Sequence, residues 1–128
     1  MDCSPVPYCS ADMSTPLSSR ALIVGGTGPT GPAIVRGLEE RGLNVTLFHT
    51  GRHEVDEVAH VEHLHGDPFS AEGVAAALAG RSFDVVVACY GRLRTIAEVL
   101  SGRCDRFVSV GGTPAYRGYF DPTRFDPP

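Results

Sequence analysis

A short apolar run passes directly into a glycine-rich turn in the stretch Ala21-Leu22-Ile23-Val24-Gly25-Gly26-Thr27-Gly28-Pro29-Thr30-Gly31-Pro32. Gly25, Gly28 and Gly31 are spaced three residues apart, and an amphipathic segment follows them. This layout predicts a strand, a tight turn and the start of a helix. The N–H groups and the dipole at a helix start attract a phosphate, and glycine lets a pyrophosphate approach the backbone. The stretch therefore predicts a nucleotide-binding loop, with a purely structural turn as the alternative.

Apolar runs and helix-like stretches alternate along the following residues. Five strands are expected, at residues 21–24, 44–48, 61–65, 83–89 and 107–110. Helices are expected at residues 32–41, 71–78 and 93–100, with Ser70 as the N-cap of the second, and residues 51–59 are expected to form a loop. Strands that alternate with helices favour an α/β fold with a doubly wound parallel sheet of about five strands.

The two ends of the chain depart from this alternation. Residues 1–19 are rich in serine and proline and are expected to form a disordered tail, with Met13 as an alternative start. Residues 20–128 are expected to form one nucleotide-binding domain. Beyond Gly111 the pattern of strands and helices stops. We therefore expect the N-terminal portion of a longer protein, with a sheet that is incomplete at its C-terminal side.

Composition excludes several classes of function. Charged residues make up 20% of the chain and the net charge is −4, so no basic surface for nucleic acid or an anionic membrane is expected. The four cysteines form no Cys-x-x-Cys pair, which favours a reducing cytoplasm over a disulfide scaffold or a zinc site. No apolar stretch approaches the roughly 18 residues of a membrane span.

The glycine loop and three later phrases resemble the NAD(P)-dependent epimerase/dehydratase family, the extended and atypical short-chain dehydrogenases/reductases. The resemblance covers about residues 20–120 and is carried by Gly25-Gly26-Thr27-Gly28-x-x-Gly31, by residues 44–52, by Gly66-Asp67, and by residues 107–110 leading to Tyr116. It implies a Rossmann fold, a nicotinamide dinucleotide and a sugar-nucleotide or related carbonyl substrate. It also allows a homodimer of the full-length protein.

The resemblance implies cofactor contacts at the ends of four predicted strands. The residues concerned are Gly25, Thr27, Gly28, Pro29, Thr30 and Gly31 in the loop, His49 and Arg52 after the second strand, Asp67 after the third, and Ala88 and Tyr90 after the fourth. Asp67 matches the family's aspartate beside the adenine, although Asp before Pro is equally an ordinary turn residue. A small buried apolar role is favoured for Cys89.

The end of the second strand bears on the choice between NAD and NADP. Dinucleotide folds that prefer NAD usually carry Asp or Glu there for the ribose hydroxyls, whereas this chain has His49. A guanidinium such as that of Arg52 can bind a 2′-phosphate through paired hydrogen bonds. The sequence therefore favours NADP, with NAD and a solvated Arg52 as the alternatives.

Three histidines, His60, His63 and His65, lie around the third strand. His63 and His65 are expected to share a face, and two such histidines can hold a metal. The sequence indicates no third ligand or carboxylate, so solvated histidines are favoured and no metal site is predicted.

Catalytic residues are where this chain departs from the family pattern. The family uses Ser or Thr after the fifth strand and a later Tyr-x-x-x-Lys for hydride transfer, in oxidation, epimerisation or dehydration. Here Gly112 takes the Ser/Thr position, Thr113 lies one step away as a candidate, and the chain contains no lysine. We therefore expect dinucleotide binding without turnover by this chain alone. A non-catalytic nucleotide-binding or scaffold protein is the alternative.

Overall fold

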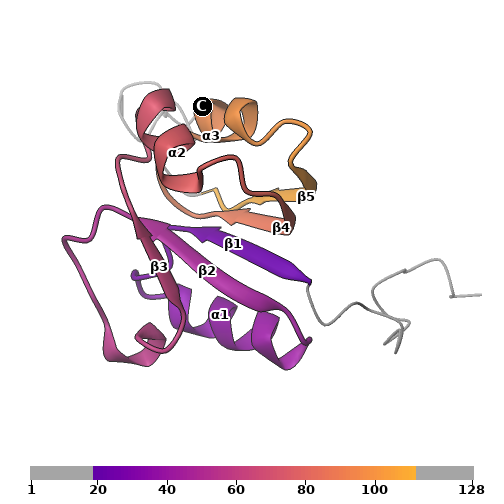
Figure 1. The fold of residues 1–128 in the computed structure, drawn as a ribbon. Coiled ribbons are helices and arrows are strands. Elements are labelled where there is room, and N and C mark those ends of the chain that lie inside the picture. Colours follow the sequence, from indigo (N-terminus) through magenta and orange to yellow (C-terminus); the bar gives the residue numbers. More distant parts are fainter. Residues whose placement is uncertain (1–18, 112–128) are drawn as a thin grey trace, which may run out of the picture.

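The computed structural model describes residues 19–111, in which five strands alternate with helices (Figure 1). In chain order the elements are β1 Arg20–Val24, α1 Gly31–Glu40, β2 Asn44–His49, the 3-10 helix η2 Asp56–Val58, β3 Glu62–His65, α2 Ala71–Leu78, β4 Phe83–Ala88, α3 Leu93–Val99 and β5 Cys104–Ser109.

All strand pairs are parallel, and the strand order is β3-β2-β1-β4-β5. The chain thus moves outward from β1 to β3, returns to the other side of β1, and moves outward again through β4 and β5. This is the order of the Rossmann fold up to its fifth strand, so the predicted α/β class is confirmed. The reversal creates a switch point between β1 and β4, and ligands of such sheets bind outside the carboxyl ends of the strands there.

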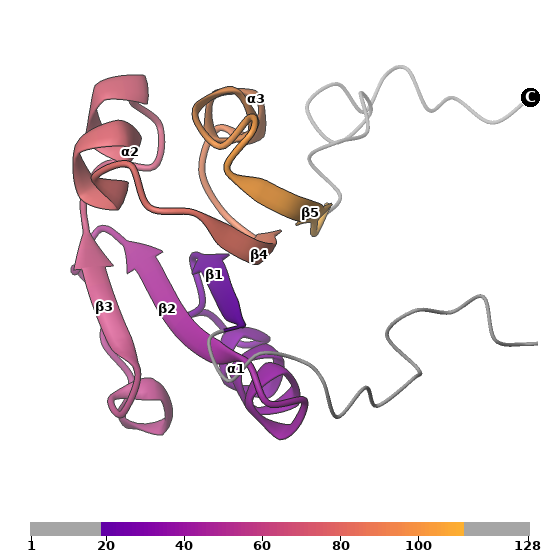
Figure 2. The same cartoon turned by 45° about the vertical axis from the view of Figure 1, so that its right-hand side comes forward.

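Helix α1 covers one face of the sheet, and α2 and α3 cover the other (Figure 2). The alternation of side chains along β1 explains both layers. Ile23 points toward the α1 side, where Val35 is buried, whereas Leu22 points toward the α2 and α3 side, where Val74 and Ile96 are buried. The central strand is therefore apolar on both faces, as its continuous apolar sequence predicts.

Most element boundaries lie within one residue of the prediction, and two segments differ by more. β5 begins at Cys104 rather than at residue 107, because Cys104 pairs with Phe83 although the residues after it are polar. The predicted loop 51–59 contains η2, whose Val58 is fully buried in the core on the α1 side. In both cases tertiary contacts order a segment that lacks an apolar pattern of its own.

Helix α2 begins at the predicted N-cap. The Ser70 Oγ accepts a hydrogen bond from the Gly73 N–H at 3.1 Å. The variant Ser70→Ala is expected to lose about 1 kcal/mol of unfolding free energy in urea, because this N–H then lacks its partner. Exposed Ser82, outside any helix, provides the matched control Ser82→Ala. Equal unfolding midpoints for the two variants would contradict the capping role.

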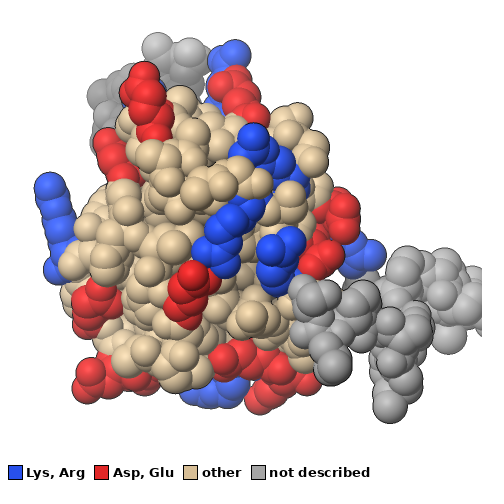
Figure 3. Space-filling model, in the orientation of Figure 1, with Lys and Arg blue, Asp and Glu red and all other residues tan. Residues whose placement is uncertain are grey.

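Acidic and basic side chains intermingle on the face shown in Figure 3, where no single sign of charge dominates. Within residues 19–111, no helix is long and apolar enough to cross a membrane.

Candidate functional site

The loop between β1 and α1 turns sharply at two glycines. Gly25 and Gly26 have φ angles of +104° and +84°, in the region that favours glycine. The Gly25 N–H donates to the Phe48 carbonyl at 2.9 Å, which ties the loop to β2, and the Gly31 N–H donates to the Gly28 carbonyl at 3.1 Å. Backbone hydrogen bonds within the loop and to β2 therefore fix the loop at the end of β1.

Gly28 and Gly31 have opposite surroundings. A Cβ at Gly31 would overlap the carbonyl group of Gly26 and lie 2.7 Å from the Gly26 Cα, whereas a Cβ at Gly28 would meet no atom within 4 Å. Gly31 is therefore required for the close packing of the helix start against the turn. Gly28 leaves open space beside the loop, as a loop that receives a phosphate requires.

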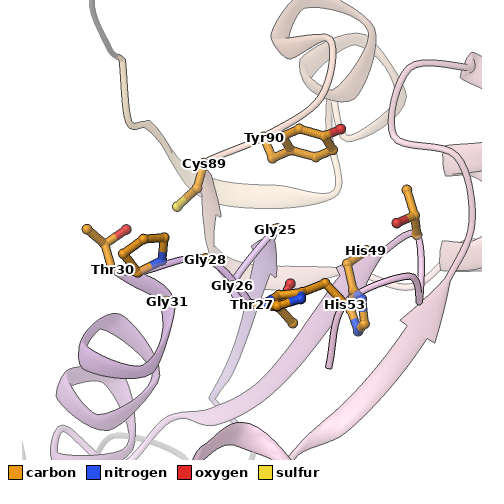
Figure 4. Close-up of a pocket in the computed structure, with 12 residues that line it drawn as sticks. Gly25, Gly26, Thr27, Gly28, Thr30, Gly31, His49, His53, Cys89 and Tyr90 are labelled. Atoms are coloured by element: carbon orange, nitrogen blue, oxygen red, sulfur yellow. The ribbon is translucent and has the colours of Figure 1, made fainter. Parts of the chain in front are cut away.

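A cavity of about 350 Å³ lies at this loop (Figure 4). Cys89 and Tyr90 reach it from the segment after β4, and His49 and His53 lie on the side of β2. The lining residues come from three places where a strand ends at the same edge of the sheet: Gly25, Gly26, Thr27, Gly28, Pro29, Thr30, Gly31, His49, Thr50, His53, Cys89 and Tyr90. The cavity thus occupies the switch point that the strand order defines.

The structure brings most of the predicted cofactor residues together. Those that line the cavity are Gly25, Thr27, Gly28, Pro29, Thr30, Gly31, His49 and Tyr90. Arg52, Asp67 and Ala88 are not among the lining residues, and Thr113 lies outside the described residues. Four lining residues were not predicted as cofactor contacts: Gly26, Thr50, His53 and Cys89. Each of the four directly follows a predicted residue in the sequence.

The end of β4 holds the far wall of the cavity in place. Ala88 is fully buried, and its carbonyl accepts from the Val110 N–H at 2.9 Å, while the Cys89 N–H donates to the Val24 carbonyl at 2.9 Å. Burial raises the pKa of the Cys89 thiol, which disfavours the nucleophilic thiolate. Tyr90 is exposed, and its ring meets the Phe69 ring edge-on at 5.2 Å. Cys89 and Tyr90 therefore offer the cavity a neutral thiol and an aromatic surface.

Asp67 has the geometry of a turn residue. Its Oδ1 accepts from the Phe69 N–H at 2.9 Å, and its carbonyl accepts from the Ser70 N–H at 3.3 Å. The side chain is exposed and stands outside the cavity lining. The turn alternative for Asp67 is thus present in the structure, and the adenine contact stays a prediction.

His49 is the last residue of β2, and its side chain is buried and uncharged. Its Nδ1 accepts from the Gly51 N–H at 3.1 Å, and its Nε2 lies 2.9 Å from His63 Nδ1. Burial is the main cause that lowers the pKa of His49, with Glu54 opposing it. The residue at the position of the usual ribose acid is therefore a neutral imidazole near pH 7.

The histidines around β3 form a cluster that the sequence analysis missed. His63 and His65 lie near each other as predicted, with ring centroids 6.3 Å apart. The sequence indicates no third group beside them, whereas the structure places His49 and Glu54 there. One nitrogen or carboxylate oxygen from each of His49, Glu54, His63 and His65 lies within 4.8 Å of those of the others. His63 is also partly buried rather than solvated. His60 stands apart from them, with its Nε2 2.9 Å from Glu39 Oε1.

Comparisons with known proteins find similar structures but no match in sequence. No family model matches the chain, and no curated protein matches it in sequence. Among solved structures, a nucleoside-diphosphate-sugar epimerase from Pseudomonas aeruginosa has a TM-score of 0.63 at 21% identity, over 76% of this chain and 34% of its own. The UDP-glucose 4-epimerase of Thermus thermophilus in complex with NAD has a TM-score of 0.55 at 20% identity, over 66% of this chain and 34% of its own.

A third similar structure is a wide-type short-chain dehydrogenase/reductase from Veillonella parvula in complex with NADP. It has a TM-score of 0.58 at 16% identity, over 86% of this chain and 57% of its own. At these identities the likeness shows the Rossmann-like fold. The chain spans between a third and three fifths of the length of these three proteins.

Proposed function

We propose that this chain binds a nicotinamide dinucleotide in the cavity beside the glycine loop. We further propose that it does so as the cofactor-binding part of an epimerase/dehydratase-type oxidoreductase. The observation that carries the proposal is Gly28, which faces open space beside the start of α1 at the switch point of a parallel sheet. A dinucleotide fold uses this combination to bring its backbone against a pyrophosphate.

The chemistry of the cavity wall suits an anionic, elongated ligand. The loop offers backbone N–H groups and the hydroxyls of Thr27 and Thr30, and the wall after β4 adds the exposed ring of Tyr90. Within the described residues, no Asp or Glu lines the cavity, so no carboxylate opposes a phosphate there. When bound, the cofactor would supply reversible hydride transfer, whereas the residues described here bind and orient it.

The neighbours in structure support the remaining parts of the proposal. Two of them are complexes with NAD or NADP, and two are epimerases whose names specify nucleotide sugars. We infer a sugar-nucleotide or related carbonyl or hydroxyl substrate for the whole enzyme, with residues 20–128 as its cofactor-binding domain and a homodimer as its assembly. The free thiols of Cys89 and Cys104 support a cytoplasmic location.

Calorimetric titration with NAD⁺ and with NADP⁺ tests the binding. We expect saturable heat with one site per chain for at least one of the two dinucleotides, accompanied by a higher thermal midpoint, because a ligand that binds only the native state stabilises it. Adenosine, which lacks the phosphates, is the control and should bind much more weakly. The absence of both heat and a thermal shift with each of the two dinucleotides would refute the proposal.

We propose NADP as the preferred cofactor, because His49 replaces the ribose acid and Arg52 follows closely on the exposed loop. Arg52→Ala should weaken NADP⁺ binding by about tenfold, the size of a lost charge-assisted hydrogen bond. Its effect on NAD⁺, which lacks the 2′-phosphate, should be small. Arg36→Ala, on the exposed side of α1, is the matched control for lost charge. An equal effect of Arg52→Ala on both dinucleotides would reject this role.

A further inference from the structure

Three histidines and one glutamate converge at the carboxyl ends of β2 and β3. His49 ends β2 and pairs in register with His65, the last residue of β3. His63 lies two positions earlier on β3, and Glu54 reaches the same point from the β2–β3 connection. The side chains of Glu54 and His65 are about half exposed, at 52% and 53%, so an ion from solvent can reach them.

The carboxylate of Glu54 bridges two imidazole nitrogens. Its Oε1 lies 3.1 Å from His65 Nε2, and its Oε2 lies 3.2 Å from His63 Nδ1. In a tetrahedral site with metal–ligand bonds of about 2.0–2.1 Å, neighbouring ligand atoms are separated by about 3.3 Å. The two distances between carboxylate oxygen and imidazole nitrogen are thus close to those of a metal site, and the ligand atoms of the cluster all lie within 4.8 Å of one another.

The hydrogen bonds of the cluster identify which nitrogen has a lone pair. His63 Nε2 lies 2.8 Å from the Val58 carbonyl oxygen, which can only accept, so Nε2 carries the hydrogen. The Nδ1 of neutral His63 is therefore an acceptor. The His49 Nδ1 accepts from the Gly51 N–H, so the hydrogen of the neutral His49 ring is on its Nε2. This Nε2–H donates to His63 Nδ1 at 2.9 Å.

The same ring nitrogen faces the Glu54 carboxylate. The Glu54 Oε2 lies 3.2 Å from His63 Nδ1, so a metal ion between them could be bound by both groups. The Val58 carbonyl already holds the His63 ring in the orientation that exposes Nδ1, as partners of metal-binding histidines commonly do.

We propose that His63 Nδ1, His65 Nε2 and the Glu54 carboxylate bind a divalent first-row transition metal such as Zn²⁺. Two imidazoles and one carboxylate suit Zn²⁺, Co²⁺ or Ni²⁺, whereas Mg²⁺ and Ca²⁺ require mainly oxygen ligands. His49 is a positioning residue, whose Nε2 lies 3.8 Å from Glu54 Oε1 and can donate to that carboxylate once the metal occupies His63.

The metal site adjoins the cavity but does not depend on the dinucleotide. Of the four clustered residues, only His49 lines the cavity. A metal on Glu54 would tie the β2–β3 connection to the end of β3, and that connection also carries the cavity residues Thr50 and His53. Metal binding is therefore measurable on the chain whether or not a dinucleotide binds.

Titration of the untagged, metal-free chain with ZnCl₂ by calorimetry tests the site, with CoCl₂ and visible absorption as a second probe. We expect one metal per chain, d–d bands without thiolate charge-transfer absorption, and no heat with MgCl₂. His65→Ala and Glu54→Gln should each weaken Zn²⁺ binding at least about tenfold. His60→Ala, which alters an exposed histidine outside the cluster, should bind as the wild type does.

Two outcomes would overturn the proposal. One is the absence of Zn²⁺ and Co²⁺ binding by the folded wild type. The other is binding that His65→Ala and Glu54→Gln leave unchanged, which would assign the metal to other groups such as the cysteines. Because both altered side chains are about half exposed, circular dichroism should show the wild-type fold. If Glu54→Gln fails to fold, His65→Asn decides the question.

Discussion

The variant Gly31→Ala should unfold at a much lower denaturant concentration than the wild type, with a loss of roughly 3 kcal/mol in unfolding free energy. The cause is steric, because the added Cβ would overlap the carbonyl group of Gly26, and backbone cannot move aside as a flexible side chain can. To relieve the overlap, α1 must shift away from the turn. That shift would disturb the packing of Val35 against the sheet.

A second glycine of α1 provides the control. A Cβ at Gly37 would meet only the Arg41 Nη1, at 3.6 Å. Gly37→Ala should therefore gain about 0.5–1 kcal/mol, since alanine is the better helix former. Urea unfolding of the two variants gives the comparison. If Gly31→Ala were as stable as the wild type, the close contact between residue 31 and the Gly26 carbonyl would be contradicted.

The variant Gly28→Ala should keep the fold and lose the ligand. No atom lies within 4 Å of the new Cβ, and the φ angle of Gly28 is not positive. The unfolding free energy should therefore change by less than about 0.5 kcal/mol. The methyl group would occupy space that the pyrophosphate needs, so dinucleotide binding should weaken by about tenfold or more.

Calorimetry and urea unfolding on the same preparation separate the two effects. Gly28→Ala and Gly31→Ala are the same chemical change three positions apart in one loop, which makes each the control for the other. Unchanged dinucleotide affinity in Gly28→Ala would mean that the ligand does not approach this part of the loop. Such a result would contradict the proposed function even if the wild type bound a dinucleotide.

The order and type of the elements could be predicted because the buried strands have their own sequence signal. β1 is buried and apolar from residue 21 to residue 24, and β4 is apolar except at Asp84. β5 could not be placed fully, because its first three residues, Cys104–Arg106, owe their conformation to pairing with β4. The same holds for η2, where a single buried side chain, Val58, orders a polar segment.

The candidate site was predictable where neighbours in sequence form it. The glycine loop and the ends of β2 and β4 meet because parallel strands end at one edge of the sheet. Contacts between residues that are distant in sequence are less well indicated by sequence patterns. His49 and His65 share a register position in β2 and β3, which the parallel pairing of two strands ending in histidine could have suggested. The approach of Glu54 depends on the path of the connection, which no pattern in the sequence specifies.

The backbone amide NMR spectrum of the ¹⁵N-labelled chain during titration with NADP⁺ and NAD⁺ tests the central claim most directly. It reports both binding and its location. We expect saturable shifts at the amides of Gly26, Thr27 and Gly28, and at Tyr90 across the cavity, with Ala75 on α2 unchanged as an internal reference. Saturating dinucleotide without shifts in the loop, or with shifts confined to another surface, would contradict the assignment of this cavity as a dinucleotide site.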